Sequence, residues 1–178
     1  AVAEMHGLDG KADTTTLVRE DGPRGFALTA RVAAVGAIAA GLGQYSGVKG
    51  RLQKKSGLSG STLIDDTYNA NPESVRAAID VLAQARGRKV LIFGDMGELG
   101  QDAPRLHAEL GTYARAAGID ELVTLGENSA RTAETFGAGA RHYDRIEDLI
   151  ADRACALGAD VTVLVKGSRF MKMERVVS

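Results

Sequence analysis

Short apolar runs alternate with longer amphipathic stretches along the chain from Thr62 onward. The apolar runs predict β-strands at residues 62–66, 89–93, 121–125, 140–143 and 161–166. The stretches between them predict helices at residues 72–85, 104–117, 128–136 and 146–157. Such alternation is typical of βα units that build a parallel sheet. The pattern therefore predicts an α/β fold with a doubly wound, mainly parallel sheet.

The first predicted helix has a well-marked start and one apolar face. Val75, Ala78, Ile79 and Leu82 recur at helical spacing, which favours a single buried stripe. Asn71 can cap the first turn, and a proline suits the first helical position that follows it.

The part of the chain before the alternating region is less regular. Residues 1–30 are short polar pieces separated by glycines. Residues 30–42 form an alanine-rich stretch that predicts a helix ending at Gly41 and Gly43. We therefore expect an irregular arm with an alanine-rich helix over 1–44, followed by an α/β domain over 45–178.

Composition and charge narrow the class of protein. The chain has 178 residues, of which 44% are hydrophobic and 25% charged, as in a globular domain. A net charge of −1 argues against nucleic acid or an anionic membrane surface as a partner bound through bulk charge. The longest apolar run, residues 32–42, is far shorter than the ~20 residues that cross a bilayer.

Cysteine and histidine usage gives no sign of a metal site. The single cysteine, Cys155, excludes an internal disulfide and lies on the apolar side of a predicted helix, where a small core residue is expected. His6, His107 and His142 are too scattered for a metal triad. His107 lies on the helix after residues 94–100, where it can face that loop. These features fit a cytoplasmic protein, because disulfides are rare in reducing compartments.

Residues just beyond the carboxyl ends of the strands are the candidates for chemistry, because open parallel sheets bind ligands there. The strand at 62–66 leads into a polar segment that contains Asp66, Tyr68, Asn69 and Asn71. A carboxylate at this place can accept both hydroxyls of a ribose, and amides can bind the edge of a base. The alternative is turn and capping chemistry, for which Asp and Asn are common residues.

The next strand leads into residues 94–100, GDMGELG. The glycine spacing differs from the dinucleotide fingerprint, and Asp95 and Glu98 would repel a pyrophosphate. These carboxylates suit an ammonium group or a metal better. The alternative is a flexible glycine loop before a helix.

Basic residues occur at two further places. After the last strand, Lys166, Ser168 and Arg169 can clamp an anion such as a carboxylate, or they form a solvated basic turn. Before the sheet, Arg51 can reach a phosphate, or it is a surface charge.

Together these motifs resemble the C-terminal domain of the bacterial Mur ligases over about residues 45–178. The resemblance rests on KGRLQ (49–53), LIDDTYNANPESVRAAIDVL (63–82), GDMGELG (94–100), HAELG (107–111) and VLVKGSR (163–169). It implies a Rossmann-like domain of a cytoplasmic ligase of peptidoglycan synthesis that uses ATP and Mg²⁺. In that family ATP phosphorylates a carboxylate, and the amine of the second substrate attacks the acyl phosphate. The implied substrates are UDP-N-acetylmuramoyl-tripeptide and D-alanyl-D-alanine.

The resemblance also implies roles for single residues. Arg51 matches an arginine directed at the nucleotide phosphates, and Asp66 matches the acidic residue that binds the ribose. Tyr68, Asn69 and Asn71 match neighbouring positions on the nucleotide face. The loop expected near the carboxylate of the amino substrate matches Lys166, Ser168 and Arg169. Asp95 and Glu98 of residues 94–100, whose carboxylates suit an ammonium group, complete the expected substrate-binding set.

The family's GKTTT phosphate loop, Mg²⁺-binding glutamate and modified lysine belong to a central domain and are not found in this sequence. Residues 1–44 are expected to be a remnant of that domain. The chain is then expected to carry half of an active site and not to turn over ATP by itself. Two other interpretations stay open: a non-catalytic nucleotide-binding α/β domain, and another ligase of the superfamily, such as a folate polyglutamylating enzyme.

Overall fold

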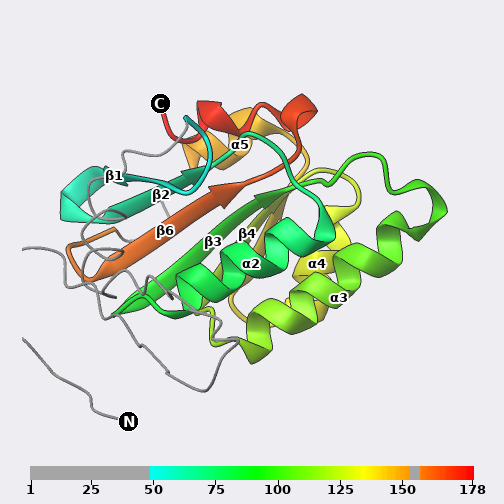
Figure 1. Ribbon diagram of the computed structural model, residues 1–178, viewed down its shortest axis with the longest axis horizontal. Helices are drawn as coiled ribbons and strands as arrows, with labels where there is room; N and C mark the ends of the chain where they lie inside the picture. Colours follow the sequence, from blue (N-terminus) through cyan, green and yellow to red (C-terminus); the bar gives the residue numbers. More distant parts are fainter. Residues whose placement is uncertain (1–48, 153–156) are drawn as a thin grey trace, which may run out of the picture. The chain divides into compact units, whose positions relative to one another are not determined.

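The computed structural model describes residues 49–152 and 157–178, which fall within one compact unit, Gly47–Ser178. Strands and helices alternate along this unit (Figure 1). The strands are β1 (Gln53–Ser56), β2 (Thr62–Asp66), β3 (Arg88–Gly94), β4 (Glu121–Leu125), β5 (Ala140–Tyr143) and β6 (Val161–Lys166). The helices are α2 (Pro72–Ala83), α3 (Ala103–Ala116), α4 (Ser129–Phe136) and α5 (Ile146–Ala151). Short 3₁₀ turns are η1 (Leu58–Gly60), η2 (Gly100–Asp102), η3 (Arg169–Met171) and η4 (Met173–Arg175).

The strands form one sheet in the order β1-β2-β6-β3-β4-β5. All neighbouring pairs are parallel except β1 with β2. The predicted α/β fold with a mainly parallel sheet is therefore confirmed. Because β2 to β6 run in one direction, their carboxyl ends meet at one edge, which is where ligands of such sheets bind.

The hydrophobic pattern does not predict β1, because its sequence QKKS is polar. Its residues alternate between half-buried and exposed, as expected of a short strand at the edge of a sheet. Lys55 of this strand forms an ion pair with Asp65 of β2. Pairing with β2 and this charge contact hold the edge strand in place, where apolar burial contributes little.

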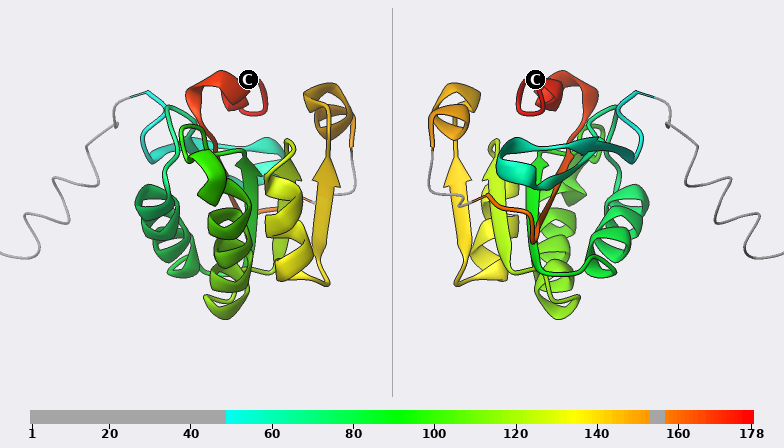
Figure 2. Two further views of the ribbon diagram at one scale, coloured as in Figure 1. Left: turned by 90° about the vertical axis from the view of Figure 1, so that its right-hand side faces the viewer. Right: turned by 90° about the vertical axis from the view of Figure 1, so that its left-hand side faces the viewer.

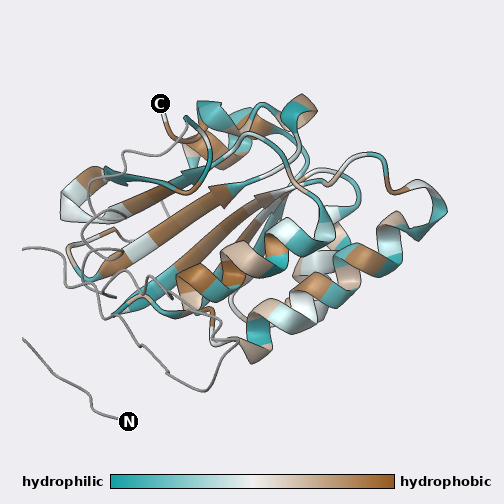
Figure 3. Cartoon of the chain, in the orientation of Figure 1, coloured by the Kyte–Doolittle hydropathy of each residue, from teal (hydrophilic) through white to brown (hydrophobic). Residues whose placement is uncertain are grey.

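The core has two layers, one on each face of the sheet. On one face, Leu91 and Phe93 pack with residues of α2, α3 and α4. On the other face, Val90 and Val163 pack with Leu149 of α5. Figure 2 shows α2, α3 and α4 side by side on one side of the sheet, with α5 and the C-terminal turns on the other. Figure 3 shows the apolar strands between these layers, which confirms the doubly wound arrangement.

The predicted start of α2 is confirmed, whereas the last predicted helix is too long. Asn71 caps α2, and Pro72 is its first residue. Helix α5 ends at Ala151, because Asp152 has an extended backbone and its carboxylate accepts a hydrogen bond from the hydroxyl of Tyr143. Residues 153–156, Cys155 among them, lie outside the described residues, as do the alanine-rich helix and the boundary expected near residue 45.

Candidate functional site

A cavity of about 370 Å³ lies at the carboxyl ends of β2 and β6. The side chains that line it come from the turn before β1, the last residue of β2 and the segment after it, the first turn of α2 and the end of β6. They are Arg51, Leu52, Asp66, Tyr68, Asn69, Asn71, Ser74 and Lys166. The five residues predicted to bind a nucleotide thus lie together, and Lys166, which was predicted to bind substrate, lines the same cavity.

Asp66 is the central carboxylate of this cavity. One of its oxygens, Oδ1, accepts a hydrogen bond from the backbone N–H of Leu52 at 3.1 Å. The other, Oδ2, accepts from Lys166 Nζ at 2.6 Å. A carboxylate oxygen can accept more than one hydrogen bond, so both oxygens keep capacity for the hydroxyls of a ligand.

Arg51 and Tyr68 form the exposed rim of the cavity. The guanidinium carbon of Arg51 lies 4.2 Å from the centroid of the Tyr68 ring, which is a cation–π distance. The backbone N–H of Tyr68 donates to the carbonyl of Gly50 at 2.9 Å, so the two turns that carry this pair are tied together. The arrangement presents a cation and an aromatic face beside the Asp66 carboxylate.

The neighbouring carboxylate, Asp65, is buried and does not line the cavity. It accepts hydrogen bonds from Lys55 Nζ at 2.5 Å and from the hydroxyl and N–H of Thr67 at 2.7 and 3.3 Å. Burial by itself raises the pKa of Asp65, but the hydrogen bonds from Lys55 and Thr67 outweigh it and hold the pKa below its ordinary value. Asp65 therefore shapes the turn that presents Asp66.

Both roles predicted for the segment after β2, ligand binding and helix capping, meet at Asn71, because it lines the cavity and also caps α2. Its Oδ1 accepts from the N–H of Ser74 at 2.8 Å, and the Ser74 hydroxyl accepts from the N–H of Asn71 at 3.0 Å. This reciprocal capping box fixes the first turn of the helix against the cavity. Ser74 was not among the predicted site residues, although its spacing from Asn71 is a recognisable capping signal.

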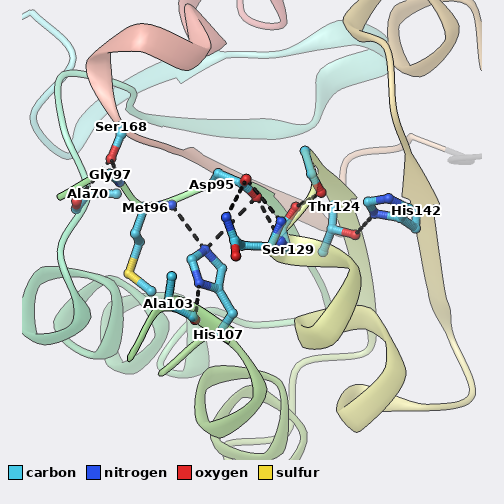
Figure 4. Close-up of polar contacts among 12 residues, drawn as sticks. Ala70, Asp95, Met96, Gly97, Ala103, His107, Thr124, Ser129, His142 and Ser168 are labelled. Carbon is cyan, nitrogen blue, oxygen red and sulfur yellow. Dashed lines mark hydrogen bonds and ion pairs between the residues drawn. The ribbon is translucent and has the colours of Figure 1, made fainter. Parts of the chain in front are cut away.

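Asp95 lies in the loop after β3, with its carboxylate turned toward the start of α4 (Figure 4). Its oxygens accept from the N–H groups of Asn128 at 3.0 Å and Ser129 at 2.7 Å. The Asn128 amide adds a contact at 3.3 Å. This geometry satisfies N–H groups that the first turn of a helix leaves without partners. The structure thus gives Asp95 a structural role, and its contact with a substrate ammonium group stays a prediction.

His107 is fully buried on α3 and faces the same loop, as its position suggested. Its Nε2 accepts from the N–H of Met96 at 3.0 Å, so Nδ1 carries the proton and donates to the carbonyl of Ala103 at 2.7 Å. Burial lowers the pKa of His107, while the Ala103 hydrogen bond and the Asp95 carboxylate 4.0 Å away oppose the shift only in part. The imidazole is therefore neutral and fixes the backbone of the loop.

The residues after β6 divide into buried and exposed ones. Ser168 is buried, and its hydroxyl donates to the carbonyl of Ala70 at 3.2 Å and accepts from the N–H of Gly97 at 2.8 Å. Arg169 is exposed and pairs with Glu174 at 3.0 Å. Ser168 thus joins the loops after β2, β3 and β6. The residues predicted to clamp an anion, Lys166, Ser168 and Arg169, therefore do not form one cluster. Substrate binding by Ser168 and Arg169 stays a prediction.

Glu98 stands at the exposed tip of the loop after β3, where its backbone is left-handed with a φ of 61°.

Within the described ranges, no group of three or more His, Cys, Asp or Glu side chains is arranged to hold a metal ion. Across the same residues, no helix is both long and apolar enough to span a membrane.

The neutral state of His107 predicts a pH-dependent stability. Its pKa in the folded chain lies below the ordinary value of 6.5, so the unfolded chain binds the proton first as the pH falls. Stability contributed at neutral pH is therefore lost as the pH drops through the unfolded pKa toward the folded one. Urea unfolding at about pH 7.5 and about pH 5.5 should show a larger loss in the wild type than in His107→Gln. Equal losses in both proteins would contradict this assignment.

Comparison with known proteins agrees with the fold and the motifs. The sequence profile described as "Mur ligase, glutamate ligase domain" matches residues 50–169. The chain therefore belongs to the Mur ligase family, in its glutamate ligase domain.

Individual relatives identify a branch of this family. The UDP-N-acetylmuramoyl-tripeptide–D-alanyl-D-alanine ligase of Escherichia coli K12 is 40% identical over 151 residues, covering 82% of this chain and 32% of that protein. A crystal structure of MurF from Acinetobacter baumannii aligns with a TM-score of 0.67 at 32% identity, over 82% of this chain and 33% of that one. MurF from Thermotoga maritima in complex with ADP aligns with a TM-score of 0.66 at 26% identity, over 83% and 36%. The chain spans about a third of the length of these relatives.

Proposed function

We propose that this chain is the C-terminal domain of an ATP-dependent, cytoplasmic ligase that joins D-alanyl-D-alanine to UDP-N-acetylmuramoyl-tripeptide. The observation that carries the proposal is the cavity at the ends of β2 and β6, where Arg51, Asp66 and Tyr68 lie together. The 40% identity to a ligase of that name supports the same reaction. The Thermotoga maritima relative, whose structure contains ADP, supports a nucleotide as the ligand.

In this proposal the cavity holds one side of ATP. The Asp66 carboxylate accepts hydrogen bonds from the ribose hydroxyls, because both of its oxygens keep acceptor capacity beside the Leu52 and Lys166 contacts. The Arg51 guanidinium stands at the open rim, where it can meet phosphate oxygens. The Tyr68 ring offers a face for stacking.

The chemistry that follows is the transfer of a phosphoryl group to the tripeptide carboxylate. The amine of the dipeptide then attacks the acyl phosphate, and phosphate leaves from the tetrahedral intermediate. This part of the ligase orients the nucleotide, and the Mg²⁺ ligands and the phosphate loop are proposed to lie in other domains. By itself the chain is accordingly expected not to turn over ATP.

Replacing Asp66 with alanine tests the nucleotide site. We expect Asp66→Ala to raise the KM for ATP in the complete ligase at least tenfold, because a hydrogen bond to a charged group contributes about 1.5–3 kcal/mol. The assay is phosphate release with UDP-N-acetylmuramoyl-tripeptide, D-alanyl-D-alanine, ATP and Mg²⁺. Asp144→Ala is the matched control, since the Asp144 side chain is 92% exposed. An unchanged KM for ATP in Asp66→Ala would remove this residue from the site.

Phosphate release must also depend on both amino-acid-bearing substrates. Turnover with ATP alone, or with another amine in place of the dipeptide, would leave the domain assignment intact and overturn the substrate assignment. ATP binding without any ligation would favour the non-catalytic nucleotide-binding domain.

A further inference from the structure

Lys166 lies beside Asp66 because of the register between two strands. β2 and β6 pair in parallel, and Asp66 and Lys166 are direct partners on the last rung of that pair. The lysine Nζ is 2.6 Å from Asp66 Oδ2 and 2.8 Å from the carbonyl oxygen of Asn69. The ammonium group thus contacts both the central carboxylate of the cavity and the backbone of the segment that lines it.

The ion pair of Lys166 with Asp66 is buried, so breaking it is costly. Lys166 is only 2% exposed, and the Asp66 side chain is 13% exposed. A lysine ammonium has three donors, and two of them are directed at Asp66 and Asn69. Removing one partner of such a buried pair leaves the other charge without compensation.

Charge in the cavity also depends on this lysine. The charged residues in its lining are Arg51, Asp66 and Lys166. A nucleotide carries several negative charges, and a carboxylate without its cation would repel the phosphates. With Lys166 in place, the negative charge of Asp66 is offset and its oxygens are held in a fixed direction.

We propose that Lys166 is a positioning residue of the nucleotide cavity, which holds Asp66 and the Asn69 backbone for ATP and does not bind the carboxylate of the amino substrate. This inference rests on the proposed function, and it reassigns a residue whose sequence position favours an anion clamp. Arg169, three residues further on, is exposed and separate from the cavity.

The test is a double-mutant cycle on ATP affinity in the complete ligase, measured by isothermal titration calorimetry with Mg²⁺. The variants are Lys166→Met, Asp66→Asn and the double variant. We expect each single variant to bind ATP about tenfold more weakly or worse, and the double variant to lose clearly less than the product of the two losses. Lys166→Arg, which keeps the cation, should recover most of the affinity. Lys54→Met, on the exposed side of β1, is the control and should bind ATP like the wild type.

Steady-state kinetics separate positioning from substrate binding. Lys166→Met should raise the KM for ATP about tenfold and leave the KM for D-alanyl-D-alanine within about twofold. A higher KM for the dipeptide with unchanged ATP affinity would overturn the inference and restore the clamp. Independent, multiplicative losses in the cycle would also overturn it, because they would mean that Lys166 does not act through Asp66.

Three further outcomes also decide the test. If the unpaired Asp66 prevents Lys166→Met from folding, the double variant is compared with Asp66→Asn alone, and only a small further loss of ATP affinity is expected. A wild type that binds ATP but ligates no dipeptide would overturn the proposed function, while the calorimetric cycle still decides on Lys166. A wild type that binds no ATP would overturn both.

Discussion

Gly111→Ala is expected to destabilise the domain by about 3 kcal/mol, although alanine normally favours a helix over glycine. Gly111 lies on α3 where this helix packs against α4. A Cβ atom there would lie 2.1 Å from the carbonyl oxygen of Thr132, 2.2 Å from Thr135 Oγ1 and 3.0 Å from the backbone nitrogen of Phe136. Two of these three atoms belong to the backbone, so the helices would have to move apart.

The same contact is reinforced by a hydrogen bond between the helices. Thr135 Oγ1 donates to the carbonyl of Ala108 on α3 at 2.7 Å, and separation of the helices would break this bond. The measurement is the urea midpoint of the chain, with Thr112→Ala as the control, because Thr112 is the next residue on α3 and is exposed. If Gly111→Ala were as stable as the control, the space between α3 and α4 would have to be larger than in the structure, and the prediction would be wrong.

The strands and helices were largely predictable from the sequence, most clearly where an apolar run is buried on both faces of the sheet. Residues 161–166 are buried throughout β6, and such continuous runs are visible without any knowledge of the fold. The start of α2 was predictable for a different reason, since Asn71 and Pro72 act locally. Strand β1 was not predictable from the sequence, because its position depends on pairing with β2 rather than on apolar burial.

The composition of the candidate site was predictable, but the direction of its side chains was not. Lys166 and Asp66 meet because β6 lies next to β2, although they are 100 residues apart in sequence. That strand order cannot be read from the pattern of apolar runs. Ser168 similarly has the residue type of an anion ligand, but its hydroxyl is used between Ala70 and Gly97. Residue type and loop position therefore predict the chemistry that is available, and strand order decides where it acts.

The assignment of Asp95 depends in the same way on which strand lies beside β3. Gly94 and Leu125 are partners in the pairing of β3 with β4, so the turn after β4 is brought against Asp95. The close approach requires a glycine at position 126, where φ is 111° and a Cβ atom would lie 2.6 Å from the carboxyl carbon of Asp95. The turn and the carboxylate are thus fitted to each other.

Asp95→Ala should consequently cost about 3 kcal/mol of unfolding free energy, close to the effect at Gly111. The change leaves the N–H groups of Asn128 and Ser129 without their acceptor, and each buried donor without a partner costs roughly 1–3 kcal/mol. Asp95→Asn keeps one acceptor oxygen and should lose less. Urea unfolding measures all three proteins, with Glu127→Ala as the control, because Glu127 is an exposed acid beside the same helix end. If Asp95 instead served mainly to bind a substrate ammonium group, Asp95→Ala would be as stable as the control and only the KM for the dipeptide would rise.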